Sequence, residues 1–241
     1  MKFVILAAGK GSRLYKKIKK NKCLLKIGKK TLIEKNIYEI NKTKVKDISI
    51  VVGFNSHKIK SHLKKYDKIN YIFNNKYNSK EMLYSLILAL KKLNDDIIFG
   101  YSDVIISHKV INKILRLKKS KITVPILSNW KKIWNIRKKD PYKDAETLFV
   151  NNNMELKSIG QKIIDIDLIK YQFMGLIYIP QNKKNIFIQQ YNKISKKNKL
   201  HLTTFINELV KNKIEVNCIK TNEKWYEFDD YEDFINYKNL I

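Results

Sequence analysis

The chain has 241 residues, 44% of them hydrophobic, which suffices for a compact core, but no apolar run is long enough to cross a membrane. The formal net charge of +28 would suit binding to a nucleic acid or to an acidic membrane surface. The lysines are spread along the chain without interleaved aromatic residues, which indicates that the charge reflects the general lysine-rich composition and that no specific nucleic-acid partner is expected. The chain begins with a strand pattern rather than a signal peptide, and its two cysteines, Cys23 and Cys218, suggest neither a disulfide framework nor a zinc site, which favours a cytoplasmic protein.

Apolar runs of strand length alternate with segments of helical period in the first half, which predicts an α/β fold with a mainly parallel sheet. Thr31 and Glu34 have the spacing of a capping box, so a helix is expected to begin there. In chain order the expected strands are Phe3–Ala8, Ile48–Val52, Asn70–Phe73, Ile97–Tyr101 and Lys121–Leu127, and the expected helices are Thr31–Ile40, Ser56–Lys65, Ser79–Leu93 and His108–Leu117.

The pattern is less regular in the second half. It predicts helices at Asn129–Lys139, Lys184–Lys193, Leu202–Lys211 and Tyr231–Asn239, a hairpin of Thr147–Val150 and Glu155–Ile159, and strands at Tyr171–Ile179 and Lys213–Ile219. No internal repeat or long linker interrupts the chain. We therefore expect a single domain over residues 1–241, with a core at 1–127 and a region at 128–241 that returns to the same sheet.

The most informative string is Ile5-Leu-Ala-Ala-Gly-Lys-Gly-Ser-Arg-Leu14, followed by Lys22. Two alanines leave room for a nucleoside, and Gly9 and Gly11 let backbone N–H groups approach phosphate oxygens. Arg13 and Lys22 place positive charge where a triphosphate would lie. No P-loop string is present, and a leucine stands where a dinucleotide fingerprint needs its third glycine. The string therefore indicates nucleoside triphosphate binding without a Walker loop.

This string, L-A-A-G-x-G-x-R-L followed by a lysine, resembles the signature of the nucleotidyltransferases that build NDP-sugars and CDP-alcohols. The resemblance implies a Rossmann-like nucleotidyltransferase fold, a mainly parallel mixed sheet flanked by helices, with Lys22 and Arg13 as catalytic residues. Asn21 stands where the family usually has proline, which leaves the loop less pre-set but keeps the charge. The implied nucleotide-binding residues here are Leu6, Ala7, Ala8, Gly9, Gly11, Ser12, Arg13 and Lys22.

The same resemblance implies a Mg²⁺ site. Asp103 directly follows a predicted strand, at the carboxyl edge of the sheet where ligands bind in open α/β folds; the alternative is that it caps the next helix. Asp229 matches the aspartate that ends a W-x-E-V/I-D string in the family. Mg²⁺ prefers carboxylate and phosphate oxygens, so the implied metal ligands are Asp103 and Asp229.

Two further features concern the C-terminal string from Trp225 to Asp230. Strand alternation places Glu227 and Asp229 on one face. Asp230 is expected to cap the terminal helix, with Asp233 completing the spacing of a box.

The choice of nucleotide is indicated by Tyr84-Ser-Leu86. It resembles an N-x-x-Y-S-L-like string of phosphocholine cytidylyltransferases, where hexose-phosphate enzymes usually have G-T-A. The resemblance favours CTP as the nucleotide. The nucleotide-binding residues that it adds are Glu81, Met82, Ser85, Tyr101 and Ser102.

The acceptor side is indicated by Asp140-Pro-Tyr-Lys-Asp-Ala-Glu-Thr-Leu148. It resembles D-P-x-x-D-A-E-T-L of a bacterial branch that includes 2-aminoethylphosphonate and phosphoglutamine cytidylyltransferases. The branch also matches Trp130, Trp134 and Arg137, together with strings around Lys162 and Gln172. The resemblance therefore covers nearly the whole chain, and its implied acceptor-binding residues are Trp130, Arg137, Asp144, Glu146, Lys162 and Gln172.

These side chains suit a small zwitterionic acceptor. Arg137 and Lys162 would meet its phosphate or phosphonate, Asp144 and Glu146 an ammonium group, and Trp130 would add a cation–π contact. The structural alternatives are that the tryptophans form a buried helix face and that Asp140 caps a turn.

Two departures from the branch bear on the acceptor. Lys170-Tyr171 replaces Glu-Gly, and Leu202-Thr-Thr204 lacks the carboxylate of M-T-D. Both changes make 2-aminoethylphosphonate itself a less secure acceptor than the reaction class.

We therefore predict a Mg²⁺-dependent cytidylyltransferase that transfers CMP from CTP to a small phosphate- or phosphonate-bearing acceptor (2-aminoethylphosphonate, phosphocholine or phosphoglutamine) and releases pyrophosphate. A homodimer is a possible assembly. The alternative enzyme activity is that of a hexose-1-phosphate nucleotidyltransferase. This sequence lacks the E-K-P acceptor motif that such enzymes usually carry, which counts against that alternative. The alternative of another class is a basic nucleic-acid-binding module on the same fold.

Overall fold

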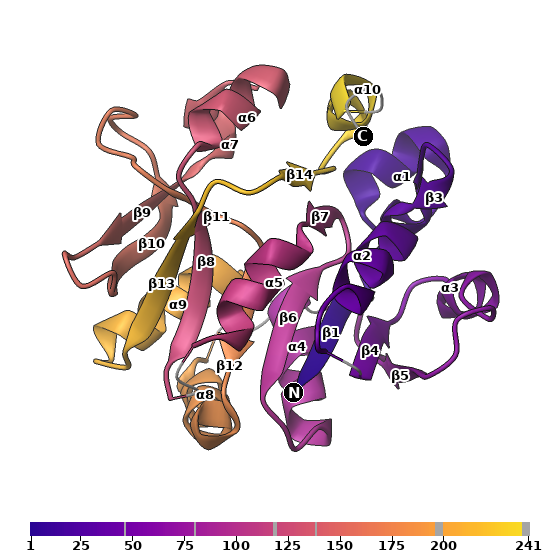
Figure 1. Ribbon diagram of the computed structural model, residues 1–241, viewed down its shortest axis with the longest axis horizontal. Helices are drawn as coiled ribbons and strands as arrows, with labels where there is room; N and C mark the ends of the chain where they lie inside the picture. Colours follow the sequence, from indigo (N-terminus) through magenta and orange to yellow (C-terminus); the bar gives the residue numbers. More distant parts are fainter. Residues whose placement is uncertain (46, 80, 118–119, 138, 196–199, 238–241) are drawn as a thin grey trace.

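The computed structural model describes residues 1–241 except 46, 80, 118–119, 138, 196–199 and 238–241 (Figure 1). Among the described residues, eight strands form one mixed sheet. The sheet order is β11 (Gln172–Phe173), β8 (Ile122–Leu127), β12 (Leu176–Ile179), β6 (Ile97–Tyr101), β1 (Lys2–Ala7), β4 (Asp47–Val52) and β5 (Ile69–Phe73), with β13 (Val216–Thr221) paired to β8.

The sheet is mainly parallel. Strands β6, β1, β4 and β5 run parallel to one another, and β13 runs parallel to β8. Strand β12 is antiparallel to both β6 and β8. The expected Rossmann-like mixed sheet is confirmed, and strands from beyond residue 127 join it beside those of the first half.

Helices cover both faces of the sheet because strand side chains alternate between two cores. In β1, Phe3 and Ile5 belong to one core and Val4 and Leu6 to the other. The first core is covered by α1 (Ser12–Ile18), α2 (Leu32–Asn41), α3 (Ser56–His62), α5 (His108–Leu115), α6 (Trp130–Arg137) and α10 (Tyr231–Tyr237). The second is covered by α4 (Met82–Lys92), α8 (Lys184–Lys193) and α9 (Leu202–Lys211), which lie behind the sheet in Figure 1.

Small pieces of secondary structure lie outside the main sheet. The antiparallel pairs are β2 (Lys26–Ile27) with β3 (Lys30–Thr31), β7 (Val104–Ile106) with β14 (Trp225–Glu227), and β9 (Glu146–Val150) with β10 (Leu156–Lys162). Single turns are η1 (Lys22–Leu24), η2 (Gln181–Lys183) and the short helix α7 (Pro141–Asp144).

Most elements predicted from the sequence are present with shifted ends. The capping box is confirmed, since Thr31 accepts from the backbone of Glu34 and the Glu34 carboxylate accepts from the backbone of Thr31. The hairpin is confirmed as β9 and β10. The helix expected from Ser79 begins at Met82 instead, because the preceding residues form turns.

Two predicted strands differ from the structure. The strand expected at Tyr171–Ile179 is divided into β11 and β12, because Gly175 between them has a φ of 71° and breaks the extended backbone. The strand expected at Lys213–Ile219 is displaced to β13. Lys213, with a φ of 58°, belongs to the turn that follows α9.

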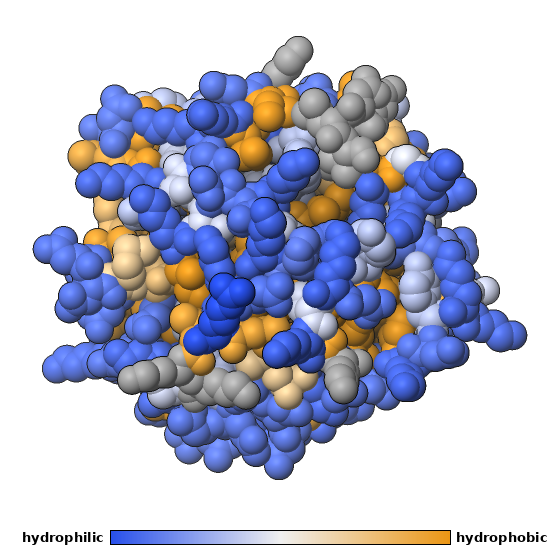
Figure 2. Space-filling view, viewed as in Figure 1, coloured by the Kyte–Doolittle hydropathy of each residue, from blue (hydrophilic) through white to orange (hydrophobic). Residues whose placement is uncertain are grey.

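No helix in the described part of the chain is both long and apolar enough to cross a membrane. Figure 2 shows one face of the molecule, where hydrophilic side chains cover most of the surface between small apolar areas.

Candidate active site

A cavity of about 630 Å³ lies at the carboxyl end of β1, which is the size expected for a nucleotide site. The glycine loop forms one wall. Gly11 has a φ of 62°, and a Cβ atom there would lie 3.2 Å from the Cβ of Lys22, so glycine allows the loop and the lysine to pack together. The predicted nucleotide-binding residues that line this cavity are Leu6, Ala7, Ala8, Gly9, Gly11, Lys22, Glu81, Met82, Ser85 and Ser102, together with Asp103.

Three predicted nucleotide-binding residues do not line this cavity. Ser12 and Arg13 lie on α1 beyond the glycine loop, and Tyr101 lines a second cavity. Sequence analysis missed Cys23, Asn74, Tyr77, Asn78 and Ser79, which do line it. The Asn74 side-chain amide donates to the Ser85 hydroxyl at 2.9 Å, so these two polar groups lie together on the cavity wall.

Asn21 replaces the expected proline with hydrogen bonds. Its buried side chain donates to the backbone carbonyl of Phe54 at 2.9 Å and accepts from Asn55 at 3.1 Å. These bonds fix the loop that begins η1 to the loop after β4. The position of Lys22 is therefore set by side-chain hydrogen bonds rather than by a proline ring.

Lys22 lies between the two predicted metal ligands. Its Nζ is 2.9 Å from Oδ2 of Asp103 and 3.2 Å from Oδ1 of Asp229, and Arg13 also contacts Asp229. Burial alone would lower the pKa of Lys22, but the charges of Asp103 and Asp229 outweigh it and raise the pKa, so the lysine is a cation. The structure thus brings together four of the predicted residues from distant parts of the chain.

The two aspartates meet because β7 pairs with β14. Asp103 immediately precedes β7, Asp229 lies two residues after β14, and the Asp103 carbonyl accepts from the Phe228 N–H at 2.9 Å. Asp103 does not cap a helix: Ser107 caps α5, and its hydroxyl accepts from Lys109.

The two carboxylates have the chemistry of a hard-cation site. Their oxygens are the ligands that Mg²⁺ favours. Asp103 lines the cavity sized for a nucleotide, and both aspartates line a smaller cavity that adjoins it. Among the described residues, no group of three or more His, Cys, Asp or Glu side chains is arranged to hold a metal by itself. This fits a cation completed by phosphate oxygens and water rather than by an all-protein cage.

A second cavity of about 280 Å³ adjoins the first and shares Glu81, Met82 and Asp103 with it. Carboxylates and aromatic rings dominate its lining, in which the described part of the chain places no lysine or arginine. The charged and aromatic lining residues are Glu81, Asp103, Asp144, Glu146, Glu227, Asp229, His201, Tyr101, Trp134, Phe173 and Trp225.

Burial perturbs two carboxyl groups of this second cavity. Burial raises the pKa of Glu227 to about 7, and the nearby Arg137 only partly opposes this effect. Burial also raises the pKa of Glu146, opposed by a hydrogen bond with Thr203. Gln172 holds the backbone of Glu146 on both sides: its side-chain amide donates to the carbonyl at 2.6 Å and its oxygen accepts from the N–H at 3.2 Å.

Arg137 supports the acceptor cavity from behind and does not line it. Its side chain is 0% exposed and forms a bidentate pair with Asp233 at 2.9 and 3.2 Å. It also contacts Asp144 and Glu227, each at 3.1 Å. The predicted contact of Arg137 with an acceptor phosphate is therefore corrected, because the guanidinium is already enclosed by carboxylates.

Trp130 and Lys162 are also corrected. Trp130 is 1% exposed, and its indole N–H donates to the carbonyl of Ile169 at 3.2 Å, so it belongs to the core and offers no face for a cation. Trp134, one turn later, stacks on Trp225, and both line the second cavity. Lys162 is exposed at the end of β10 and lines neither cavity.

Two capping predictions are confirmed. Asp140 accepts from the Tyr142 N–H at 3.0 Å and caps α7. The carboxylate of Asp230 accepts from the N–H of Asp233 at 3.0 Å, and the Asp233 carboxylate accepts from the N–H groups of Asp229 and Asp230. The start of α10 thereby fixes the backbone of Asp229.

The family model of the MobA-like NTP transferase domain matches residues 3–135, which is more than half of the chain, and includes the glycine loop, Lys22 and Asp103. The chain belongs to this family and is a nucleotidyltransferase.

The relatives and the solved structures agree with this assignment. The chain is 27% identical over 248 residues to a CTP:phosphoglutamine cytidylyltransferase of Campylobacter jejuni, with 97% of each chain covered. It is 30% identical over 117 residues to a choline-phosphate cytidylyltransferase of Streptococcus pneumoniae, with 48% of this chain and 51% of the relative covered. The fold matches an inositol-1-phosphate CTP transferase from T. maritima with a TM-score of 0.78 and 17% identity, covering 98% of this chain and 94% of the other.

Proposed function

We propose that this nucleotidyltransferase transfers CMP from CTP to a small acceptor that carries a phosphate or phosphonate group, and that it releases pyrophosphate. The observation that carries the proposal is the position of Lys22 and Asp103 where a nucleotide-sized cavity adjoins a smaller, acid-lined one. The names of the two curated relatives, both cytidylyltransferases with phosphorylated acceptors, support CTP as the nucleotide.

In this mechanism the acceptor oxyanion attacks the α-phosphorus of CTP in line and expels pyrophosphate. An ionised phosphate or phosphonate is already a nucleophile, so no general base is needed. Lys22 neutralises charge on the α-phosphate, and Arg13, exposed on α1, neutralises the leaving pyrophosphate. Asp103 and Asp229 would hold Mg²⁺, which supplies further charge neutralisation when bound.

The acceptor cavity supports an acceptor with a cationic end. An acceptor whose phosphate lies at Lys22 would extend toward Glu146 in this cavity. Among the described residues no lysine or arginine lines the cavity, although Arg137 pairs with Asp144 and Glu227 from behind. Tyr101 and Phe173 add aromatic surface to the lining, whereas Trp134 already stacks on Trp225 and contacts the Arg137 guanidinium.

The two departures from the acceptor branch lie outside the cavity lining. Thr204 is exposed on α9, whereas its neighbour Thr203 lines the cavity. Lys170 is exposed and Tyr171 is partly buried, and neither is among the lining residues. Because these positions lie outside the lining, the missing carboxylates do not change the acidic residues of the cavity. The lining therefore still supports an aminated acceptor.

The proposed location is the cytoplasm, where the reaction would draw on CTP; the two free, buried cysteines are consistent with a reducing compartment. A homodimer is a prediction that awaits a measurement of mass in solution.

The test is pyrophosphate release from each of the four NTPs against 2-aminoethylphosphonate, phosphocholine, phosphoglutamine and glucose 1-phosphate, with and without Mg²⁺. We expect turnover with CTP, Mg²⁺ and at least one of the first three acceptors. Turnover with glucose 1-phosphate alone would replace the proposal by the sugar-phosphate alternative. Full activity in the presence of a chelator would remove the metal from the mechanism.

A further inference from the structure

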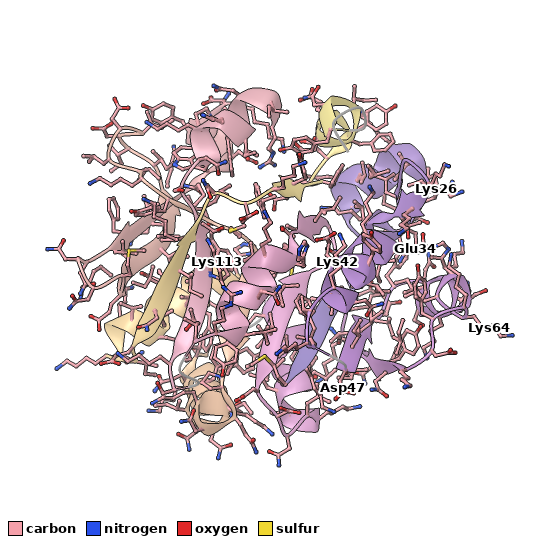
Figure 3. All side chains as sticks on the ribbon, in the orientation of Figure 1. Lys26, Glu34, Lys42, Asp47, Lys64 and Lys113 are labelled. Atoms are coloured by element: carbon pink, nitrogen blue, oxygen red, sulfur yellow. The ribbon has the colours of Figure 1, made fainter. Side chains whose placement is uncertain are left out.

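A cavity of about 530 Å³ lies outside the active site. Residues of α2, of the start of α5 and of the ribbon formed by β7 and β14 enclose it, and Figure 3 labels Lys42 at its edge, just after α2. Its lining includes five lysines: Lys30, Lys35, Lys42, Lys109 and Lys224. The lysine-rich composition alone does not explain this, because among the described residues one lysine lines the nucleotide cavity and none lines the acceptor cavity.

The positive charge of this cavity is only partly neutralised. Lys42 pairs with Glu39 at 2.5 Å, and Lys109 lies 3.7 Å from Glu223. Glu39 also accepts from the backbone and the ring of His108, so its carboxylate is fully engaged.

Three lysines of the lining keep their charge. Within the part of the chain that the structure describes, no acidic side chain lies within ion-pair distance of Lys30, Lys35 or Lys224. Lys35 is partly buried; burial and the charge of Lys30 lower its pKa, and the charge of Glu39 partly opposes this effect.

We propose that this cavity is a second anion site and that it binds a small ligand with two or more linked phosphate groups, such as a di- or triphosphate. Three ammonium groups that lack an acidic partner among the described residues match the several charges of such a chain, whereas a single carboxylate would neutralise only one of them. The volume lies in the range of small-molecule sites. Tyr226 and Tyr38, whose ring already lies under the ammonium groups of Lys30 and Lys42, provide aromatic surface for a base if the ligand is a nucleotide.

The cavity lies behind the active site, across one strand. In β14, Tyr226 faces this cavity while Trp225 and Glu227 on either side of it line the acceptor cavity. Tyr226 pairs with Ile105 of β7, which also lines the anion cavity, and Asp103 immediately precedes β7. A ligand here would therefore contact the back of the ribbon that joins the two aspartates.

The test is equilibrium dialysis of radiolabelled tripolyphosphate with the full-length protein at about 0.15 M salt, where long-range attraction to scattered lysines is screened. Tripolyphosphate resembles the phosphate chain of CTP, so we expect two molecules bound per chain, one in each site. In Lys35→Ala/Lys224→Ala the second site should weaken by about tenfold for each lysine, leaving one molecule bound. In Lys22→Ala the active-site molecule should be lost and the second site kept.

The matched control is Lys58→Ala/Lys64→Ala, which removes the same charge from exposed positions around α3. It should keep both molecules bound. Equal loss in the control and in Lys35→Ala/Lys224→Ala would show a nonspecific effect of charge and overturn the site, as would two molecules still bound to Lys35→Ala/Lys224→Ala.

The same titration with CTP and ATP distinguishes the sources of the ligand. Tighter binding of a nucleotide than of tripolyphosphate at the second site would assign the site to nucleotides through the tyrosines. Equal affinity would assign it to free polyphosphate. Absence of any second molecule from the wild-type protein with all three probes would refute the proposal, and this outcome would leave the proposed cytidylyl transfer untouched.

Discussion

Replacement of Arg137 by methionine should destabilise the protein by about 3–5 kcal/mol, the cost expected when one partner of a buried ion pair is removed. The change keeps an apolar side chain in the core but removes the guanidinium from three carboxylates, of which Asp233 is 0% exposed. Lys139, whose Nζ lies 2.9 Å from Asp233, compensates part of the loss, so we expect a value near the lower end, about 3 kcal/mol.

Urea unfolding followed by circular dichroism measures this loss, with Arg116→Met as the control because Arg116 is exposed after α5. The control should change the free energy of unfolding by less than about 0.5 kcal/mol. A loss below about 1 kcal/mol in Arg137→Met would contradict the reasoning, since it would mean that the buried carboxylates do not need the guanidinium.

Arg137→Lys adds a functional readout. It keeps the charge but cannot make the bidentate contact, so Asp144 and Glu227 should be held less well. The KM for the acceptor should rise more than the KM for CTP. An equal rise of both constants would show that Arg137 has only a structural role.

Three further predictions concern single side chains. Gly11→Ala should raise the KM for CTP several-fold, because the new Cβ would crowd Lys22. The control is Gly28→Ala, where φ is 64° and no atom lies near the added Cβ; it should lower stability by a similar amount (about 1 kcal/mol) but leave the KM for CTP unchanged. Glu146→Gln should raise the KM for an aminated acceptor by about tenfold and spare its des-amino analogue; a uniform effect in steady-state kinetics would refute the ammonium contact. Glu34 is buried, which alone would raise its pKa, but hydrogen bonds from Lys65 and Thr31 lower that pKa to about 2. The Glu34 carboxylate therefore stabilises the fold above about pH 4.5, and this contribution is lost as the pH falls toward 2. Urea unfolding should show that Glu34→Gln lowers the free energy of unfolding by about 1–2 kcal/mol at pH 6 and by less at pH 3. A loss that does not depend on pH would contradict this.

The sequence predicted the strands of the core well because each is an apolar run that ends in turn residues. It missed α1, a seven-residue helix in which only Leu14 is fully buried, so the apolar pattern is too short to signal the helix. It expected a strand around Glu227 but missed β7 and the pairing of β7 with β14, because a three-residue strand carries too little pattern to be recognised. Yet this ribbon is what brings Asp103 and Asp229 together, which is why the sequence alone did not pair them.

The acceptor side shows the limit of matching motifs to roles. Trp130 and Trp134 are four residues apart and look equivalent in sequence, but only Trp134 reaches the cavity, while Trp130 turns into the core. Arg137 belongs to the right constellation, but it acts on the acidic residues rather than on a ligand. The partners that decide such roles, Asp233 among them, lie on α10 almost a hundred residues away.

The most direct test of the central claim is pyrophosphate release by Lys22→Ala with CTP, Mg²⁺ and the preferred acceptor, compared with the wild-type protein and with Lys26→Ala. Lys26 is exposed four residues away, in β2, and serves as the charge-matched control. We predict that kcat/KM falls by about 10³-fold or more in Lys22→Ala while circular dichroism shows a folded protein, and that Lys26→Ala is unaffected. Near-normal pyrophosphate release from folded Lys22→Ala would contradict the placement of the catalytic centre between Asp103 and Asp229.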